Sequence, residues 1–146
     1  MLLSTALGLS LACAPSTMNK DGHYENMEPQ KSHGPAEVKI HVGDDVAEVF
    51  KNLSPKVQSI RFAPGDYEAR DTLHLPRTGG LVIIDGNGAN LKLGSMGFYS
   101  MPNSKDEAML YNHTRYLIRN FSTITGGEKG IMLGSSFNTV IENIEF

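Results

Sequence analysis

Two charged residues occupy matching positions in two similar segments, and their types and spacing could do chemistry. Residues 118–121 have the sequence Ile-Arg-Asn-Phe, and residues 141–144 echo it as Ile-Glu-Asn-Ile. If the two segments lie side by side, Arg119 and Glu142 are neighbours on an outer surface. A guanidinium beside a carboxylate could form part of a site, but a cross-strand ion pair on a solvated face is the commoner arrangement. We therefore favour a structural interpretation of this pair.

The same echo predicts stacked repeats, because a fixed period of roughly 20–50 residues is typical of such architectures. At the separation that the echo sets, the paired inward positions are Ile118/Ile141, Asn120/Asn143, Phe121/Ile144 and Thr123/Phe146. Earlier in the chain, Phe62 and Ile84 are separated by almost the same interval, which suggests one more repeat. The interval from Ile84 to Ile118 is longer than one repeat, and we place the excess in an irregular insertion at Gly94–Glu107.

Asn120 and Asn143 are predicted to lie in tight turns between strands. Stacked Asn side chains can hydrogen-bond to one another and form a ladder along such a stack. The alternative is that each Asn is an ordinary turn residue. The matched apolar flanks favour the ladder.

The composition predicts one folded, turn-rich β domain. A chain of 146 residues is enough for one ordinary domain. With 40% hydrophobic and 20% charged residues it should fold rather than stay disordered. Fifteen Gly and no Trp suit a β protein better than a helical bundle. The net charge of -3 argues against nucleic acid as the main partner.

Residues 1–13 are predicted to be a secretory signal, because an apolar stretch ends at Cys13, the single cysteine. The stretch is too short to cross a bilayer, which takes about 20 residues. Residues 10–13 resemble a bacterial lipobox, which would make Cys13 a lipid attachment site. Cleavage at the small-x-small site Ala12–Ala14 and a buried apolar N-terminus are the alternatives. Either signal predicts an extracytoplasmic protein: an outer-membrane or cell-surface lipoprotein bound to the membrane only through its lipid, or a periplasmic or secreted protein.

Residues 14–35 are polar and Pro/Gly-punctuated, which predicts a flexible tether before a folded domain at 36–146. Residues 37–42 alternate as a strand. Asp45 and Glu48 then form a capping box for a helix that reaches Leu53 before Pro55. From Ser59 onward we expect only short strands and turns, at residues 60–62, 72–75, 81–84, 90–93, 108–111, 116–118, 130–133 and 139–141.

These elements resemble the N-terminal part of the pectin-lyase-like family. The helix resembles the family's cap, and the segments 60–67, 73–76 and 83–89 resemble its opening coil. The resemblance covers about residues 37–146. It implies an all-β fold, a right-handed parallel β-helix (a single-stranded solenoid) with a short N-terminal capping α-helix. A leucine-rich repeat and a β-sandwich of hairpins are the alternatives.

The resemblance also implies a polysaccharide lyase or glycoside hydrolase. It is the only indication of a cofactor, which would be calcium. Hydrolysis needs two carboxyls at a set separation, and elimination needs a base and cations beside the sugar. The outward charges are Arg61, Asp85, Arg119, Glu142 and Glu145. They identify no catalytic set, and the five His residues have no metal-ligand spacing. The catalytic residues therefore stay unassigned.

The chain stops at Phe146, in the middle of an expected strand. Terminal repeats of a stack normally carry a polar cap. We therefore expect a truncated β-helix that acts on polysaccharide and is inactive as it stands. The alternative is a non-catalytic carbohydrate-binding or surface-adhesion scaffold. The oligomeric state stays open.

Overall fold

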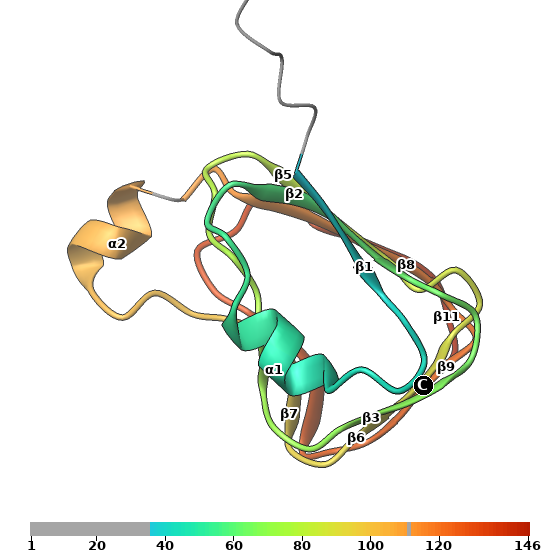
Figure 1. Ribbon diagram of the computed structural model, residues 1–146. Coiled ribbons are helices and arrows are strands. Elements are labelled where there is room, and N and C mark those ends of the chain that lie inside the picture. Colours follow the sequence, from blue (N-terminus) through green and yellow to red (C-terminus); the bar gives the residue numbers. More distant parts are fainter. Residues whose placement is uncertain (1–35, 111) are drawn as a thin grey trace, which may run out of the picture. The chain divides into compact units, whose positions relative to one another are not determined.

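The computed structural model describes residues 36–110 and 112–146 (Figure 1). The expected signal or lipobox at 1–13, Cys13 itself and the tether at 14–35 lie outside the described residues. In chain order the elements are β1 (Ala36–Ile40), α1 (Val46–Lys51), β2 (Val57–Phe62), β3 (Asp66–Ala69), β4 (Leu73–His74), β5 (Leu81–Asp85), β6 (Asn90–Leu93), β7 (Met96–Ser100), α2 (Lys105–Leu110), β8 (Arg115–Phe121), β9 (Thr123–Gly126), β10 (Lys129–Leu133) and β11 (Val140–Ile144).

The described part is mostly β and contains three sheets. Their strand orders are β1-β2-β5-β8-β11, β3-β6-β9 and β4-β7-β10. From β2 onward the chain enters the three sheets in the same order on each circuit, so each strand pairs with the strand one circuit earlier. Every pairing between described strands is parallel. In Figure 1 the strands of each sheet overlie one another.

The predicted register is confirmed in the later circuits. Ile141 lies opposite Ile118, and Ile144 lies opposite Phe121. Ile84 lies opposite Ile118, as the separation across an insertion predicts.

Two expected pairs of the register are wrong. Ile84 faces Ile60 rather than Phe62. A slip of two residues leaves the same side chains facing inward, so alternation alone does not reveal it. Thr123 and Phe146 are not ladder partners, because Phe146 follows the end of β11 and lies in no strand.

Helix α1 begins where the capping pattern predicts. Oδ1 of Asp45 accepts a hydrogen bond from the backbone N–H of Glu48 at 3.1 Å, and Val46 and Phe50 are buried. The helix ends at Lys51, earlier than expected, because the side chain of Asn52 donates to the Glu48 carbonyl at 2.9 Å. In Figure 1 α1 lies across the interior, and it contacts β3 and β4.

The insertion predicted at residues 94–107 is misplaced, because that stretch contains β7. This strand pairs with β4 and β10, and its Phe98 is fully buried. Gly97 suggests a loop in the sequence, but a Cβ there would collide with the carbonyl oxygen of Gly130 on the next circuit. The glycine therefore permits close strand packing, and the interruption runs from Met101 to Thr114.

The strand expected at 108–111 is also wrong, because α2 occupies residues 105–110. Oγ of Ser104 accepts from the backbone N–H of Glu107 at 3.1 Å, which caps the helix start. No residue of α2 is buried, and Met109 and Leu110 are each 65% exposed. Within residues 36–110 and 112–146, neither helix has the length and apolarity to cross a membrane.

Arg77 joins this interruption to the sheets. Its side chain is 7% exposed, and Nη1 donates to Ser100 Oγ at 3.2 Å and to the Gly134 carbonyl at 2.9 Å. Its Nε lies 3.8 Å from a carboxylate oxygen of Glu107, the residue capped by Ser104. The buried guanidinium therefore has a charge partner on α2.

Aromatic rings from different circuits fill the interior. Phe62 and Phe121 meet edge to face with centroids 5.1 Å apart, although they lie on the first and third circuits. Phe98 lies 5.7 Å from Phe121 and 5.8 Å from Phe50 of α1. Gly86 follows β5, the strand between those of Phe62 and Phe121, and a Cβ on it would stand 2.5 Å from Cγ of Phe121. The glycine thus allows rings two circuits apart to touch.

We expect Gly86→Ala to lower the free energy of unfolding by about 1–3 kcal/mol, because the added methyl overpacks the ring cluster. Gly80→Ala is the matched control, since the nearest atom to its Cβ is Thr78 Oγ1 at an ordinary 3.8 Å. Urea denaturation of both variants measures the difference. Equal transition midpoints would show that Gly86 is not needed for this contact.

Candidate functional site

The outward charges of the five-stranded sheet form one row across it. Lys39 pairs with Arg61, Arg61 with Asp85, Asp85 with Arg119, and Arg119 with Glu142. Neighbouring strands lie about 4.8 Å apart, so each charge is close to the next along the row. Arg119 and Glu142 lie at matching positions, as the sequence predicts. Arg61 lies opposite Asp85 only because of the two-residue slip, and Glu145 follows β11 and is not a member of the row.

Within the row, the ion pair joins Arg119 to Asp85 rather than to Glu142. Nε and Nη2 of Arg119 lie 3.3 and 3.2 Å from Oδ2 of Asp85. The two side chains are 35% and 14% exposed, respectively. Among the described residues no Arg119–Glu142 contact falls within 4.0 Å. The prediction that Arg119 forms an ion pair with Glu142 is therefore wrong. The carboxylate that Arg119 contacts belongs to Asp85, which lies one circuit earlier, on β5.

Asp85 is held as a carboxylate by the groups around it. Burial opposes its ionisation, but hydrogen bonds from the Asn120 side chain and the Asn87 backbone N–H, together with the Arg119 charge, bring its pKa below the ordinary value. The bonds measure 3.2 Å from Asn120 and 3.0 Å from Asn87. An ionised and fully engaged carboxylate is a structural brace and a poor general acid.

Asparagines in the left-handed conformation form the corner beside this row. Asn120 and Asn143 have φ of 59° and 54°, and Nδ2 of Asn143 donates to Oδ1 of Asn120 at 3.2 Å. Nδ2 of Asn120 continues the chain of bonds to Oδ1 of Asp85. Asn87 also has a positive φ, 49°, and donates to the Phe62 carbonyl at 3.3 Å. The sequence missed Asn87 and Asp85 here, although the turn signal at residues 85–88 was visible.

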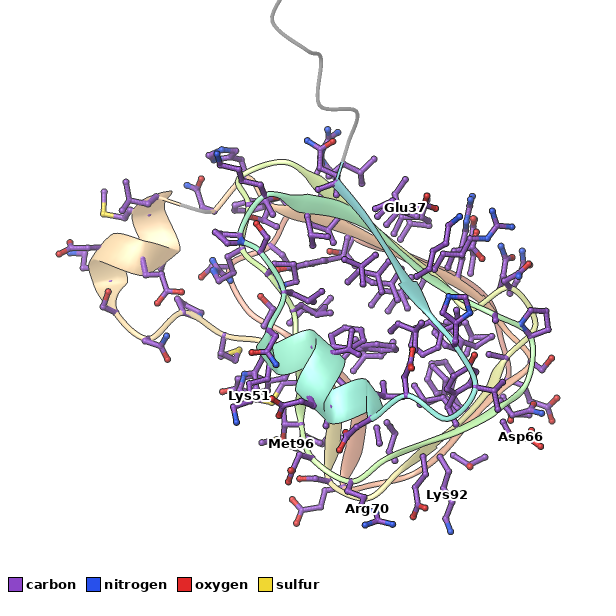
Figure 2. All side chains as sticks on the ribbon, viewed as in Figure 1. Glu37, Lys51, Asp66, Arg70, Lys92 and Met96 are labelled. Atoms are coloured by element: carbon purple, nitrogen blue, oxygen red, sulfur yellow. The ribbon has the colours of Figure 1, made fainter. Side chains whose placement is uncertain are left out.

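The sheet β3-β6-β9 carries a second polar surface, which the sequence did not single out. Its outward positions are Asp66, Glu68, Asn90, Lys92, Thr123 and Thr125, and they line a shallow hollow of about 360 Å³. Figure 2 shows Asp66 and Lys92 pointing away from the interior. We call these six residues the polar face.

One row of the polar face is already hydrogen-bonded. Nδ2 of Asn90 donates to Asp66 at 2.7 Å, and Thr123 Oγ1 donates to Asn90 Oδ1 at 3.0 Å. The other row holds Glu68 opposite Lys92 and Lys92 opposite Thr125. In the described part of the chain these three side chains make no hydrogen bond or ion pair with another residue. They are exposed and can bind a ligand.

Metal ligands do not gather within residues 36–110 and 112–146. No three His, Cys, Asp or Glu side chains there come close enough to hold an ion. His74 instead packs edge to face on Tyr99, with centroids 5.4 Å apart. The residues described here therefore place no calcium ion.

We expect Asp85→Asn to flatten the loss of stability at acid pH. Because the folded-state pKa of Asp85 is lowered, its stabilisation is complete above the ordinary Asp pKa, about 3.9, and is lost as pH falls through the lower folded value. Chemical denaturation between about pH 6 and about pH 2.5 measures this, and the variant should lose about 1–2 kcal/mol at neutral pH. The exposed Asp71→Asn is the control. An unchanged acid limb in Asp85→Asn would rule out this role.

The Asn120 corner yields a second test. Asn120→Ala and Asn120→Gly lose the same side-chain bonds, but only alanine strains the left-handed backbone. We expect the alanine variant to be less stable than the glycine variant by about 1 kcal/mol in urea denaturation. An alanine variant as stable as the glycine variant would contradict a left-handed Asn120.

Comparison with family models, with curated proteins and with solved structures found no match. The functional argument therefore rests on two surfaces of the chain itself. These are the charge row with its asparagine corner and the polar face of β3-β6-β9.

Proposed function

We propose that this chain forms a right-handed parallel β-helix, capped by α1, that acts on polysaccharide. Three features support the β-helix: parallel in-register pairing, the fixed order in which the chain enters the three sheets, and the Asn143–Asn120 bond at a left-handed corner. The resemblance to the pectin-lyase-like family supports the substrate class. The residues described here would bind the glycan rather than cleave it.

The polar face is the observation that carries glycan binding. Its side chains are hydrogen-bond donors and acceptors on three successive strands, spaced by about 4.8 Å. Sugar hydroxyls are small polar groups that recur along a polymer, so a regular array of partners suits them. Glu68, Lys92 and Thr125 offer an acceptor, a donor and a group that does both.

Cleavage by the described residues has less support. Hydrolysis by two carboxyls requires one of them to act as an acid with a raised pKa. The pKa of Asp85 is shifted in the opposite direction, and its oxygens are bonded to Arg119 and Asn120. The second candidate function is therefore a non-catalytic carbohydrate-binding or surface-adhesion scaffold, which the same polar face favours.

Affinity electrophoresis of the full chain in gels containing neutral or acidic polysaccharides tests the proposal. We expect retardation of the wild-type chain in at least one gel. The dissociation constant of Glu68→Ala/Lys92→Ala should be about tenfold higher, since two hydrogen-bonding groups are removed. Lys105→Ala/Glu128→Ala removes one charge of each sign from exposed positions outside the face and serves as the control.

The same samples, assayed for new reducing ends and for unsaturated sugar products, test whether these residues bind the glycan without cleaving it. Release of either product by the wild-type chain at rates typical of such enzymes would contradict our assignment of binding alone to these residues. Absence of retardation in every gel would contradict both candidate functions.

A further inference from the structure

Three basic side chains border one hollow where β1 and β2 end. The hollow measures about 250 Å³ and is lined by residues 39–41, residues 61–64 and Asn87. Lys39, His41 and Arg61 are its basic residues, and all three are exposed. None of the lining residues is an Asp or a Glu.

The charge row is unbalanced at this end. Lys39 and Arg61 lie directly opposite each other on neighbouring strands, an arrangement in which like charges repel. Within the described part of the chain, neither side chain has a carboxylate within 4.0 Å. Asp85 is the next residue of the row, but its carboxylate is engaged by Arg119.

The nearby neutral and acidic groups do not remove this imbalance. Arg61 Nη2 reaches Oδ1 of Asn87, a neutral acceptor, at 3.4 Å. The carboxylate of Asp44 accepts the backbone N–H of His41 at 2.7 Å, but Asp44 does not line the hollow. Two permanent cations therefore share a concave site with a third basic side chain and no anion.

We propose that Lys39, His41 and Arg61 bind an oxyanion group, a carboxylate or sulfate, carried by an acidic polysaccharide. A planar guanidinium matches an oxyanion with two parallel N–H donors, and a lysine adds a point charge. Pockets for drug-sized ligands measure about 300–1,000 Å³, so this smaller hollow suits a single charged sugar unit. The polysaccharide as the source of the group rests on the proposed function, whereas the oxyanion chemistry follows from the site.

The test compares two double variants of the full chain with equal changes in net charge. Lys39→Gln/Arg61→Gln alters the site, and Lys105→Gln/Arg115→Gln removes one exposed Lys and one exposed Arg elsewhere. The probes are a polyuronate, dextran sulfate and neutral dextran, titrated calorimetrically at low salt, where exposed charges are least screened. Thermal denaturation verifies that each variant is folded.

We expect the site variant to bind at least one acidic probe about fivefold more weakly than the control variant does. Weaker binding of polyuronate by the site variant identifies a carboxylate as the bound group, and weaker binding of dextran sulfate identifies a sulfate. Equal weakening in both variants, or acidic binding unchanged in the site variant, would overturn the site and leave glycan binding by the polar face intact. Failure of the wild-type chain to bind any glycan in these titrations or in the gels would overturn the proposed function as well.

Discussion

In-register parallel pairing is the constraint on which the rest of the structure depends. It makes each residue a neighbour of the residue one circuit away, at the spacing of adjacent strands. Inward positions consequently form apolar rows, such as Ile84, Ile118 and Ile141. Outward positions also form rows, so each charged surface residue faces the residue that stands one circuit away. Such a stack is more stable when the side chains that face each other along a row attract one another than when they repel.

The corners show how the chain meets this requirement. At Asn120 and Asn143 the backbone turns in the left-handed conformation, so the turn is repeated on these two circuits. The side-chain amide carries a donor and an acceptor, so identical residues can bond to one another without a change of type. Where the stack lacks an Asn partner, Asp85 accepts the bond instead and pairs with Arg119. The corner and the charge row are therefore one bonded unit.

The periodic parts of this fold could be predicted from the sequence. The prediction was wrong where residues typical of one kind of structure lie in another. The apolar and Asn echoes predicted the later register, and Asp45 with Glu48 predicted the start of α1. The irregular composition of residues 94–107 suggested an insertion, although β7 lies there and needs Gly97 for close packing against Gly130.

The second helix was also missed, for a different reason. The apolar residues of α2 suggested a strand. Ser104 and Glu107, which form the same kind of cap as Asp45 and Glu48 at α1, would have predicted the helix. The polar face could not be singled out because the register of β3, β6 and β9 was not predicted. Without that register, nothing in the sequence indicates that Glu68, Lys92 and Thr125 lie on the same surface.

The same constraint determines where a ligand can bind. Aromatic rings such as Phe62, Phe98 and Phe121 fill the interior, so recognition must use the outer faces and corners. A surface built from rows has a period, and a polysaccharide is a ligand with a period. If the chain binds polysaccharide as we propose, each additional circuit would offer polar groups to a further sugar unit. The unbalanced charges of Lys39 and Arg61 interrupt this regularity at one end of the row, where a polymer could be recognised by its acidic group and not only by its hydroxyls.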